Sequence, residues 1–343
     1  MEQKPKIALL GMTPDALAEV AAEAGLRRFA AGQMAKWIYD KRVSEIDEMT
    51  DLPKQARALL SEKYCIGTYA PKLVTESADG TRKYLFEGAG GRDVEAVYIP
   101  DGDRATLCVS SQAGCKMGCT FCMTGRQGFH GNLAASQILN QIFSIPESRS
   151  LTNIVFMGMG EPMDNLDEVL RAIDVLTAKW GLGWSPTRIT VSTIGKLAEM
   201  KRLIETTKVH LAVSVHSPLP SQRAELMPVE RAFPMVKIVD LLRKYDFAHQ
   251  RRLTMEYIMW HGVNDTIRHA EALARLIKGT GARVNLIRFH AIPDSPLAPA
   301  TREAMEAFRD RLNAIGVTAT IRASRGEDIM AACGMLAGKQ KDK

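Results

Sequence analysis

An alternation of apolar, strand-like segments with amphipathic, helix-like segments occupies most of the chain and constrains its fold more than any other feature. The strand-like segments are residues 106–110, 153–157, 188–191, 209–215, 254–259 and 284–288. The helix-like segments between them are residues 133–143, 165–178, 197–205, 236–245 and 266–278. Strands that alternate with helices form parallel sheets with right-handed crossovers. The sequence therefore predicts an α/β fold, a partial (β/α)6 barrel of the TIM type, with its active site at the carboxyl ends of the strands.

The first hundred residues follow other patterns. Residues 1–70 have helical character, with Thr13 as the expected N-cap of one helix and Asp51 as that of a later one. Residues 71–100 have an apolar period of two and are interrupted by glycines, which indicates hairpins. The expected domains are an N-terminal helical accessory domain at 1–70, a connecting hairpin segment at 71–100, a core barrel at 101–328 and a C-terminal tail at 329–343.

Three cysteines lie close together after the first barrel strand. Cys115, Cys119 and Cys122 form a C-x3-C-x2-C run. Cysteine thiolates are the usual ligands of iron–sulfur clusters, and three of them can hold three irons of one [4Fe–4S] cluster. The fourth iron then stays open to a small molecule. A structural zinc site is the alternative, but such sites usually combine two C-x2-C pairs. The spacing favours the cluster.

The composition of the chain limits its class and its surroundings. Its 343 residues suffice for a large core, and 46% hydrophobic with 24% charged residues is ordinary for a globular protein. The apolar runs are too short to cross a membrane, and no signal segment opens the chain. Six cysteines do not form a disulfide scaffold at this length, and thiolate ligands need a reducing compartment. We therefore expect a cytoplasmic protein.

The chain carries a net charge of +6, which is compatible with a nucleic-acid partner. Part of the positive charge lies in the N-terminal module, in Arg27, Arg28, Lys36, Lys41 and Arg42. A solvated helix face explains these residues as well as an RNA contact does.

The sequence around the three cysteines resembles one enzyme family closely. Residues 106–115, with the text TLCVSSQAGC, and residues 126–129, with RQGF, are similar to the RlmN/Cfr family of radical S-adenosylmethionine (SAM) RNA methyltransferases, and closer to RlmN. The resemblance extends from about residue 29 to residue 338. It implies a radical SAM core barrel, a [4Fe–4S] cluster on the three cysteines, two SAM molecules per turnover and an electron donor such as flavodoxin or ferredoxin. It also implies RNA as the partner, held in part by residues 29–60 of the accessory domain.

Several residues at strand ends match the SAM contacts of this family. Gly160 and Glu161 follow the second strand in the text GMGEP, and the resemblance implies that they bind the SAM amino group. Without the resemblance, a tight strand-to-helix turn explains this segment. Further matches, each otherwise only a strand end, are Ser192, Ser214, Val215, His216 and His290. The family usually has an asparagine where this chain has His290, and residues 226–233 also differ from the family text. Both departures leave the target RNA and the modified carbon open.

Two cysteines outside the cluster motif match family cysteines. By resemblance, Cys333 accepts a methyl group from one SAM, and a 5′-deoxyadenosyl radical from a second SAM activates this methyl group for addition to an adenine ring. Glu95, on an apolar strand face, matches the family's proton acceptor, and Cys108 then attacks Cys333 and releases the product with a transient disulfide. By themselves, the two cysteines also fit small buried hydrophobes, and Glu95 fits an edge-strand residue that reaches solvent.

The resemblance implies methylation of adenine C2 in RNA. The expected substrates are the 23S rRNA adenosine at the peptidyl-transferase centre and, as a second substrate, the tRNA adenosine next to the anticodon. A Cfr-type methylation of adenine C8 in 23S rRNA is one alternative, and a non-catalytic protein that binds zinc or RNA is another. An adenine must leave its stack to enter such a pocket, which single-stranded RNA loops permit.

Overall fold

A computed structural model describes residues 5–247, 249 and 251–337 of the chain. Its contacts divide the chain into two compact units, each of them discontinuous in sequence. The helical unit contains residues 1–71, 133–150 and 167–185, and the barrel unit contains residues 72–132, 151–166 and 186–343. The expected tail is described as far as Ala337, and its remainder lies outside the described residues. Across the described part of the chain, no helix is both long and apolar enough to span a membrane.

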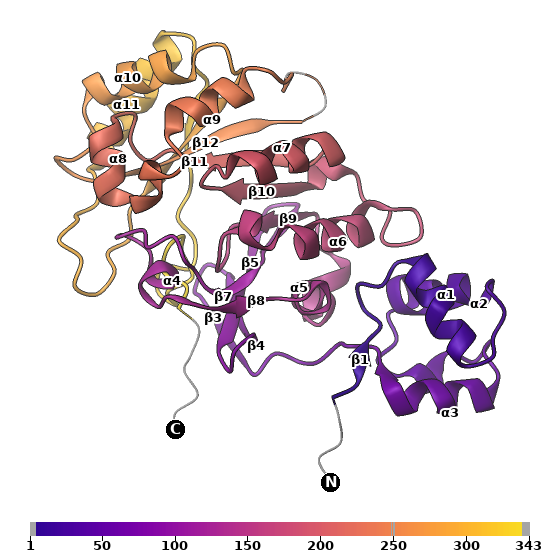
Figure 1. Ribbon diagram of the computed structural model, residues 1–343. Helices are drawn as coiled ribbons and strands as arrows, with labels where there is room; N and C mark the ends of the chain where they lie inside the picture. Colours follow the sequence, from indigo (N-terminus) through magenta and orange to yellow (C-terminus); the bar gives the residue numbers. More distant parts are fainter. Residues whose placement is uncertain (1–4, 248, 250, 338–343) are drawn as a thin grey trace. The chain divides into compact units, whose positions relative to one another are not determined.

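Short helices form most of the helical unit (Figure 1). Its elements are β1 (Ile7–Ala8), α1 (Pro14–Glu23), α2 (Ala30–Ala35), a π-helical segment (Lys36–Lys41), 3-10 turns (Ile46–Glu48 and Pro146–Arg149), α3 (Lys54–Lys63), β2 (Tyr64–Cys65), α5 (Ala135–Phe143) and most of α6 (Leu166–Thr177). A buried tyrosine joins its segments. The Tyr39 hydroxyl donates to the Met12 carbonyl at 2.6 Å and accepts from the Gly11 amide at 3.1 Å. Its polar group is thereby satisfied inside an apolar core.

The two helix starts predicted in this unit have different outcomes. Thr13 is the N-cap of α1 as predicted, because its hydroxyl accepts a hydrogen bond at 3.3 Å from the amide three residues further on. The prediction for α3 was wrong: its N-cap is Pro53, and no side chain caps it. The Asp51 carboxylate accepts a hydrogen bond from the Trp37 indole instead, which removes it from the helix end.

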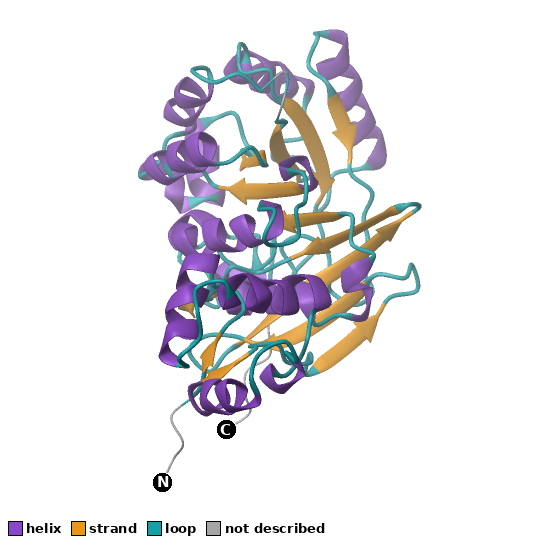
Figure 2. Cartoon of the chain, turned by 90° about the vertical axis from the view of Figure 1, so that its right-hand side faces the viewer, coloured by secondary structure: helices purple, strands orange, loops and turns teal. Residues whose placement is uncertain are grey.

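A ten-stranded sheet runs through the described part of the barrel unit (Figures 1 and 2). Its parallel strands are β6 (Arg104–Cys108), β9 (Asn153–Phe156), β10 (Ile189–Thr193), β11 (His210–Ser214), β12 (Leu253–Met259), β13 (Arg283–Arg288) and β14 (Ala319–Ile321). Their order in the sheet follows their order in the sequence, as successive crossovers of one hand produce. Figure 2 shows the strands turning progressively across the sheet. The predicted partial barrel is confirmed, and each predicted strand overlaps an observed one.

Antiparallel strands extend the sheet at one edge. They are β3 (Leu73–Glu76), β4 (Arg82–Glu87) and β5 (Asp93–Asp101), and β5 pairs with β6. The hairpins expected in residues 71–100 are therefore strands of the main sheet. A separate two-stranded sheet, β7 (Gln112–Gly114) with β8 (Phe129–Asn132), flanks the cysteine motif. The sequence patterns did not predict this small sheet, because three or four residues are too few to show a period of two.

Six helices lie in the described part of the barrel unit, and the longer ones bury one stripe. They are α4 (Met123–Arg126), α7 (Leu197–Thr206), α8 (Pro220–Leu226), α9 (Met235–Leu242), α10 (Ile267–Ile277) and α11 (Arg302–Ala314), with 3-10 turns at Pro162–Asn165, Pro186–Arg188 and Pro228–Arg231. In α10 the buried stripe is Ala270, Leu273 and Ile277, as the helical period requires. Helices α7, α9, α10 and α11 pack side by side in this order. Helix α8 was not predicted, because its seven residues show too little of the period.

Candidate active site

A cavity of about 540 Å³ lies inside the barrel unit, a volume in the usual range of cofactor and small-molecule sites. Most of the predicted site residues line it: Cys108, Cys115, Cys119, Cys122, Gly160, Glu161, Ser192, Ser214, His216, His290 and Cys333. Glu95 and Val215 are described and buried but do not line the cavity. The fold thus brings together residues from the first barrel strand to the C-terminal tail.

The three motif cysteines lie on the loop that leads from β7 into the short helix α4. Gly114 begins this loop with φ of 73°, and a Cβ atom there would lie 1.8 Å from the Gly128 carbonyl oxygen. Only glycine permits that approach. The Cys115 amide donates to the same carbonyl at 2.9 Å, and backbone amides of the loop face the sulfurs of Cys115 and Cys122. Amide donors that point at sulfur stabilise its thiolate form.

The donor set of the three cysteines suits an iron–sulfur cluster, because cysteine thiolates are its usual ligands. A cluster distributes its cysteines over several irons, so their sulfurs surround a larger core. Burial raises the pKa of Cys115 to about 12 and also raises the pKa of Cys119 and of Cys122. Iron would offset that penalty by placing positive charge beside the thiolates.

An apolar cluster surrounds the cysteine loop. Trp260 is fully buried, and its ring centroid lies 5.0 Å from that of Phe121 and 5.8 Å from that of Phe289. Cys119 and Cys122 pack against this cluster. Surroundings of this kind exclude water and strengthen electrostatic interactions between the groups inside.

The C-terminal tail is attached to the cysteine loop at two points. The Met123 amide donates to the Gly334 carbonyl at 2.8 Å, and the Thr124 hydroxyl donates to the Leu336 carbonyl at 2.7 Å. These bonds hold Cys333, which precedes Gly334, in the cavity that the cluster motif lines.

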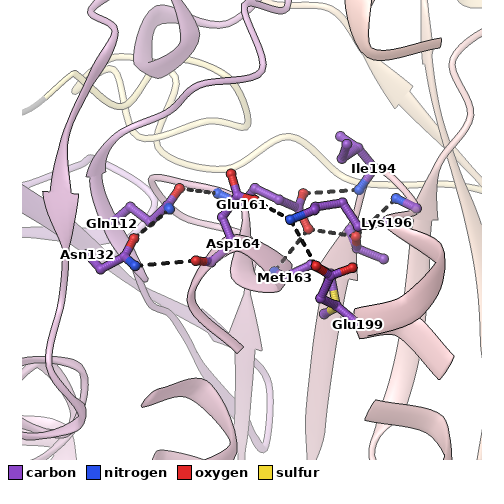
Figure 3. A network of polar contacts seen from close by, with 10 residues as sticks. Gln112, Asn132, Glu161, Met163, Asp164, Ile194, Lys196 and Glu199 are labelled. Carbon is purple, nitrogen blue, oxygen red and sulfur yellow. Dashed lines mark hydrogen bonds and ion pairs between the residues drawn. The ribbon is translucent and has the colours of Figure 1, made fainter. Parts of the chain in front are cut away.

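Glu161 is the centre of a polar network at the ends of β9 and β10 (Figure 3). Its carboxylate accepts hydrogen bonds from the Met163 amide at 3.1 Å, the Thr193 hydroxyl at 2.6 Å and the Ile194 amide at 3.1 Å. Its own amide donates to the Gln112 side chain at 2.8 Å. Burial raises the pKa of Glu161 to about 7 although these hydrogen bonds lower it. A cation in the cavity, such as an ammonium group, would favour the ionised carboxylate.

Gly160 permits the close approach on which this network depends. Its φ is 96°, and a Cβ atom there would lie 2.5 Å from the Gln112 side chain. The network continues outward through a second carboxylate, because Lys196 lies 2.7 Å from Asp164 and 3.1 Å from Glu199 (Figure 3). We call Glu161 with its donors Met163, Thr193 and Ile194 the carboxylate anchor.

A buried ion pair supports the strand ends next to the carboxylate anchor. Arg223 is fully buried and pairs with Glu230. The Arg223 guanidinium also donates to three strand-end carbonyls, those of Ser214 at 2.9 Å, Val215 at 3.0 Å and Ile194 at 3.3 Å. A buried ion pair is tolerated when further hydrogen bonds satisfy both partners. This pair therefore fixes the ends of β10 and β11 relative to each other.

His216 follows β11 in an uncommon backbone conformation. Its φ is 56°, in the left-handed region. Its Nδ1 accepts a hydrogen bond from the Ile258 amide at 3.1 Å, so the proton of the neutral ring lies on Nε2. Burial, and after it the Arg223 charge, lowers the pKa of His216 to about 3. The ring is thus a neutral hydrogen-bond donor of fixed orientation.

The other predicted SAM contacts differ in their exposure to the cavity. Ser192 and Ser214 are half-buried and line it. Val215 is buried, its side chain is apolar, and its carbonyl is bonded to Arg223. His290 is buried and lines the cavity, and its Nδ1 lies 3.2 Å from the Glu327 carboxylate in a geometry that forms no hydrogen bond.

A second group of residues lines the same cavity, and we call Cys108, Glu256, Arg322 and Cys333 the sulfur pocket. An Arg322 Nη lies 3.3 Å from the Cys333 sulfur. Burial raises the pKa of Cys108 to about 12, the charge of Cys333 raises it too, and Arg322 acts in the opposite direction. Burial also raises the pKa of Glu256, against the influence of Arg322. Two free thiols, one carboxyl group and one guanidinium are therefore electrostatically coupled.

Glu95 lies on β5, away from the cavity lining. One of its carboxylate oxygens lies 3.1 Å from Lys83 Nζ, and the other accepts a hydrogen bond from the Ala337 amide at 2.8 Å. Lys83 also donates to the Met330 carbonyl at 3.4 Å. Glu95 thus helps to hold the tail that carries Cys333, a role that the sequence pattern did not suggest.

Sequence reasoning missed four residues of the site: Thr193, Arg223, Glu256 and Arg322. Glu256 had a signal, because it is a carboxylate inside the otherwise apolar segment MEYIM. Arg322 had none, since an arginine at a strand end usually reaches solvent. Its position beside Cys333 depends on the tail folding back over the barrel.

Comparison with protein families agrees with this architecture. Residues 7–66 match the family model described as the ribosomal RNA large subunit methyltransferase N-terminal domain. Residues 109–277 match the model of the radical SAM superfamily. The second match covers the cysteine motif, the carboxylate anchor and strands β9 to β12.

Individual proteins match over nearly the whole chain. A probable dual-specificity RNA methyltransferase RlmN of Parabacteroides distasonis is 60% identical, over 96% of this chain and 96% of that protein. The dual-specificity RNA methyltransferase RlmN of Dichelobacter nodosus is 40% identical, over 98% of this chain and 96% of that protein. Among solved structures, a radical SAM methyltransferase from Sphaerobacter thermophilus has a TM-score of 0.90 at 39% identity and covers 96% of this chain.

The partial barrel and its three-cysteine loop are those of a radical SAM enzyme. Within that class, the chain belongs to the RlmN family of RNA methyltransferases.

Proposed function

We propose that this chain methylates C2 of adenine in RNA. The proposed substrates are the 23S rRNA adenosine at the peptidyl-transferase centre and the tRNA adenosine next to the anticodon. The observation that carries the proposal is the presence of Cys108 and Cys333 in one cavity with the cluster motif. Ring C2 of adenine is electron-poor and does not attack a sulfonium methyl group, so its methylation needs a carrier for the methyl group and radical chemistry. Relatives named dual-specificity RNA methyltransferases support two kinds of RNA substrate.

Cys115, Cys119 and Cys122 would hold a [4Fe–4S] cluster and leave one iron to SAM. When bound, the cluster supplies the electron that starts radical chemistry on SAM. That electron comes from outside the chain, and we propose flavodoxin or ferredoxin as its source. The apolar cluster around Trp260 shields the site from water.

The rim of the cavity would bind the remainder of SAM. The Glu161 carboxylate would accept hydrogen bonds from the SAM amino group, beside the open backbone of Gly160. Its raised pKa matches this task, because a bound cation converts it to the carboxylate. The further proposed contacts are Ser192, Ser214, Val215, His216 and His290. Of these, His216 offers a donor whose tautomer is fixed by Ile258.

Cys333 would carry the methyl group. Its thiolate attacks the methyl carbon of one SAM, a carbon–sulfur bond forms on Cys333, and the sulfonium carbon–sulfur bond breaks with its electron pair. The thiol proton passes to water, and no net oxidation occurs. A second SAM is then needed for the radical step, which gives two SAM molecules per turnover.

Cys108 and Glu95 would complete the turnover. Cys108 attacks the Cys333 sulfur once the methyl carbon is bonded to adenine, so a disulfide forms and the bond between Cys333 sulfur and that carbon breaks. The electron pair stays on the carbon, which takes up a proton to complete the methyl group, and an external two-electron reductant restores the thiols. Glu95 is the proposed proton acceptor. The Glu95 carboxylate forms an ion pair with Lys83 and accepts a hydrogen bond from the Ala337 amide. Its role as proton acceptor therefore requires the tail to shift when RNA binds.

The N-terminal residues would form an accessory domain that holds RNA. Arg27, Arg28, Lys36 and Lys41 are exposed on the helical unit, whereas Arg42 donates to Ser148 at 2.7 Å inside it. Four exposed cations suit contacts to phosphates. We keep the accessory domain at 1–70, the hairpin segment at 71–100, the core at 101–328 and the tail at 329–343 as proposals, with the cytoplasm as the location of a protein that has free thiols.

The test is methylation of unmodified rRNA and tRNA in vitro with methyl-labelled SAM, the reconstituted protein and a reducing system. Digestion of the RNA and mass spectrometry map the label. Label in 2-methyladenosine supports the proposal, and RNA without label contradicts it.

A second outcome is methylation of adenine C8, which His290 keeps open because it stands where the family usually has an asparagine. Label in 8-methyladenosine in the same experiment would establish it. Metal analysis distinguishes a C2 or C8 methyltransferase from a non-catalytic zinc protein, since either methyltransferase needs iron and sulfide in stoichiometric amounts.

A further inference from the structure

The Arg322 guanidinium donates hydrogen bonds to two sulfur atoms. It follows β14, and its amide donates to the Leu286 carbonyl at 2.8 Å, which continues the pairing with β13. One Nη lies 3.3 Å from the Cys333 sulfur and 3.9 Å from the Met157 sulfur. Arg223, the other buried arginine of the site, bonds a carboxylate and three carbonyls. A thiol or thioether is a weak acceptor, but a thiolate is a strong one.

The surroundings of Arg322 contain groups that become anions. Cys333 on the tail, Glu256 on β12 and Cys108 on β6 interact electrostatically with it. The charge of Cys333, and after it that of Glu256, raises the pKa of Arg322 although burial lowers it. The Glu256 carboxylate also accepts a hydrogen bond from the Asn285 side-chain amide at 3.3 Å. A guanidinium stays charged in proteins, and burying it is costly unless an anion lies beside it.

We propose that Arg322 is a positioning residue of the two-cysteine chemistry: its guanidinium holds the Cys333 sulfur as a thiolate aimed into the cavity and later does the same for Cys108. The inference deepens the proposed function and rests on it. A cation beside a cysteine is the usual device by which proteins supply a thiolate near neutral pH.

The sequence of charges in the sulfur pocket fits this role. Before methyl transfer, the Cys333 proton goes to water and the guanidinium neutralises the thiolate. The methyl carbon then bonds to Cys333 while the sulfonium bond breaks with its electron pair, so the new thioether is neutral. The guanidinium is thereby released from Cys333 and can stabilise the thiolate of Cys108, which attacks the Cys333 sulfur once the methyl carbon is bonded to adenine. The disulfide forms as the bond between Cys333 sulfur and that carbon breaks, the electron pair stays on the carbon, which takes up a proton from solvent, and an external two-electron reductant restores both thiols.

Alkylation of Cys333 by iodoacetamide measures its thiolate directly. The holoenzyme is used without SAM or RNA, under anaerobic conditions near neutral pH, and peptide mass spectrometry follows Cys333. We expect Arg322→Gln to slow alkylation about tenfold, because it removes the cation from the thiolate. Arg322→Lys keeps a cation and should stay within about threefold of the wild type.

Two further variants test the electrostatic cause. Glu256→Gln removes the competing carboxylate and should accelerate alkylation about threefold. Arg325→Gln removes a cation that lines the same cavity but pairs with Asp101 at 3.0 Å, and it should leave the rate unchanged. The absorbance of the cluster and the melting temperature check that each variant is folded.

Equal rates in the wild type and Arg322→Gln would overturn the proposal. If the alkylation rate of Cys333 falls equally in Arg322→Gln and Arg322→Lys, the proposal is overturned too, because such a result indicates a structural role for Arg322. If Arg322→Gln does not retain its cluster, Glu256→Gln decides, since an unchanged or slower rate contradicts the proposal. The proposed function fails separately, if the wild type never carries a methylated Cys333 in the presence of SAM.

Discussion

The carboxylate anchor and the sulfur pocket face the same cavity but are built differently. In the anchor, Glu161 accepts three hydrogen bonds from its own chain within 3.1 Å (Figure 3). In the sulfur pocket, Arg322 donates to two sulfurs. Burial raises the pKa of Cys108 and of Glu256, so both groups resist ionisation. Under the proposed function, the anchor would be a preformed binding site, and the pocket would consist of groups whose charge changes during the reaction.

This difference supports the proposal that the anchor serves ligand binding and the sulfur pocket serves the chemical steps. A binding site gains from donors that are already oriented, because little entropy is lost when the ligand arrives. A site that forms and breaks bonds at sulfur needs groups that accept both a thiolate and a neutral thioether. Mutations in the two regions should therefore differ in kind: loss of affinity at the anchor, and loss of turnover with affinity retained at the pocket.

The largest effect is expected for the cysteines of the sulfur pocket. Cys333→Ala and Cys108→Ala should each reduce RNA methylation about a thousandfold or more, because groups that act as one unit are lost together. Cys333→Ala should take up no methyl group, whereas Cys108→Ala should still do so and keep its RNA bound covalently. SAM affinity should change little in either variant.

The matched control for these variants is Cys65→Ala. Cys65 is a half-buried thiol of the helical unit whose pKa is raised by burial. Its removal should leave methylation unchanged. RNA methylation at the wild-type rate in Cys333→Ala would refute the carrier role.

The next largest effect is expected at the ion pair that supports the anchor. Glu230→Gln leaves the buried Arg223 charge without its partner and should lower the free energy of unfolding by about 3–5 kcal/mol. Thermal or denaturant unfolding measures it. Replacing both partners with apolar residues, Arg223→Met with Glu230→Leu, should recover much of the loss. A Glu230→Gln variant as stable as the wild type would show that the pair does not support these strand ends.

A smaller effect, confined to binding, is expected at the anchor itself. Glu161→Gln removes the negative charge that we propose as the partner of the SAM amino group, and it should weaken SAM binding about tenfold to a hundredfold. Titration calorimetry measures it. Glu199→Gln is the control, because Glu199 belongs to the outer network and pairs with Lys196. Equal affinities of Glu161→Gln and the wild type would remove Glu161 from the SAM site.

The smallest effect is a pH dependence that the anchor shows and Glu161→Gln lacks. The pKa of Glu161 is raised from 4.5 to about 7, so SAM affinity should fall about tenfold per unit as pH drops below that value. Stability changes in the opposite direction. Because the folded-state pKa lies above the unfolded value, Glu161 stabilises the fold below pH 4.5, and this contribution is lost as pH rises through 7.

Binding and melting curves of the two proteins between about pH 5 and 8 measure both trends. Glu161→Gln should become more stable relative to the wild type as pH rises. Parallel curves for the two proteins would contradict the raised pKa.

Most of the fold could be predicted from the sequence because parallel strands that are buried on both faces leave continuous apolar runs. Six of the seven parallel strands, β6 and β9 to β13, gave such apolar runs, and amphipathic patterns marked α5, α6, α7, α9 and α10 between them. The start of α3 could not be predicted, since Asp51 is occupied by Trp37, a contact that the local sequence does not reveal. The short sheet of β7 and β8 and helix α8 contain too few residues for a period to appear.

Some residues of the site could likewise be predicted from local sequence patterns, and others could not. The cysteine motif and Glu161 belong to short sequence patterns, so their place in the cavity could be expected. Glu256 lies on β12 and Arg322 follows β14, and only the fold of the partial barrel and tail brings them beside Cys108 and Cys333, the two cysteines that the family resemblance indicated. Glu95 shows the opposite case, because its sequence match pointed to chemistry while its contacts with Lys83 and Ala337 hold the tail.

A pulse and chase of methyl groups tests the central claim, that the methyl group reaches adenine C2 by way of Cys333. The protein is first incubated with isotope-labelled SAM, freed of it, and then given unlabelled SAM with RNA for a single turnover. The account predicts that the first methyl group found at adenine C2 carries the isotope, and that the label leaves the Cys333 peptide as it appears in the RNA. A first methyl group without the isotope, or label that stays on Cys333, would contradict the account.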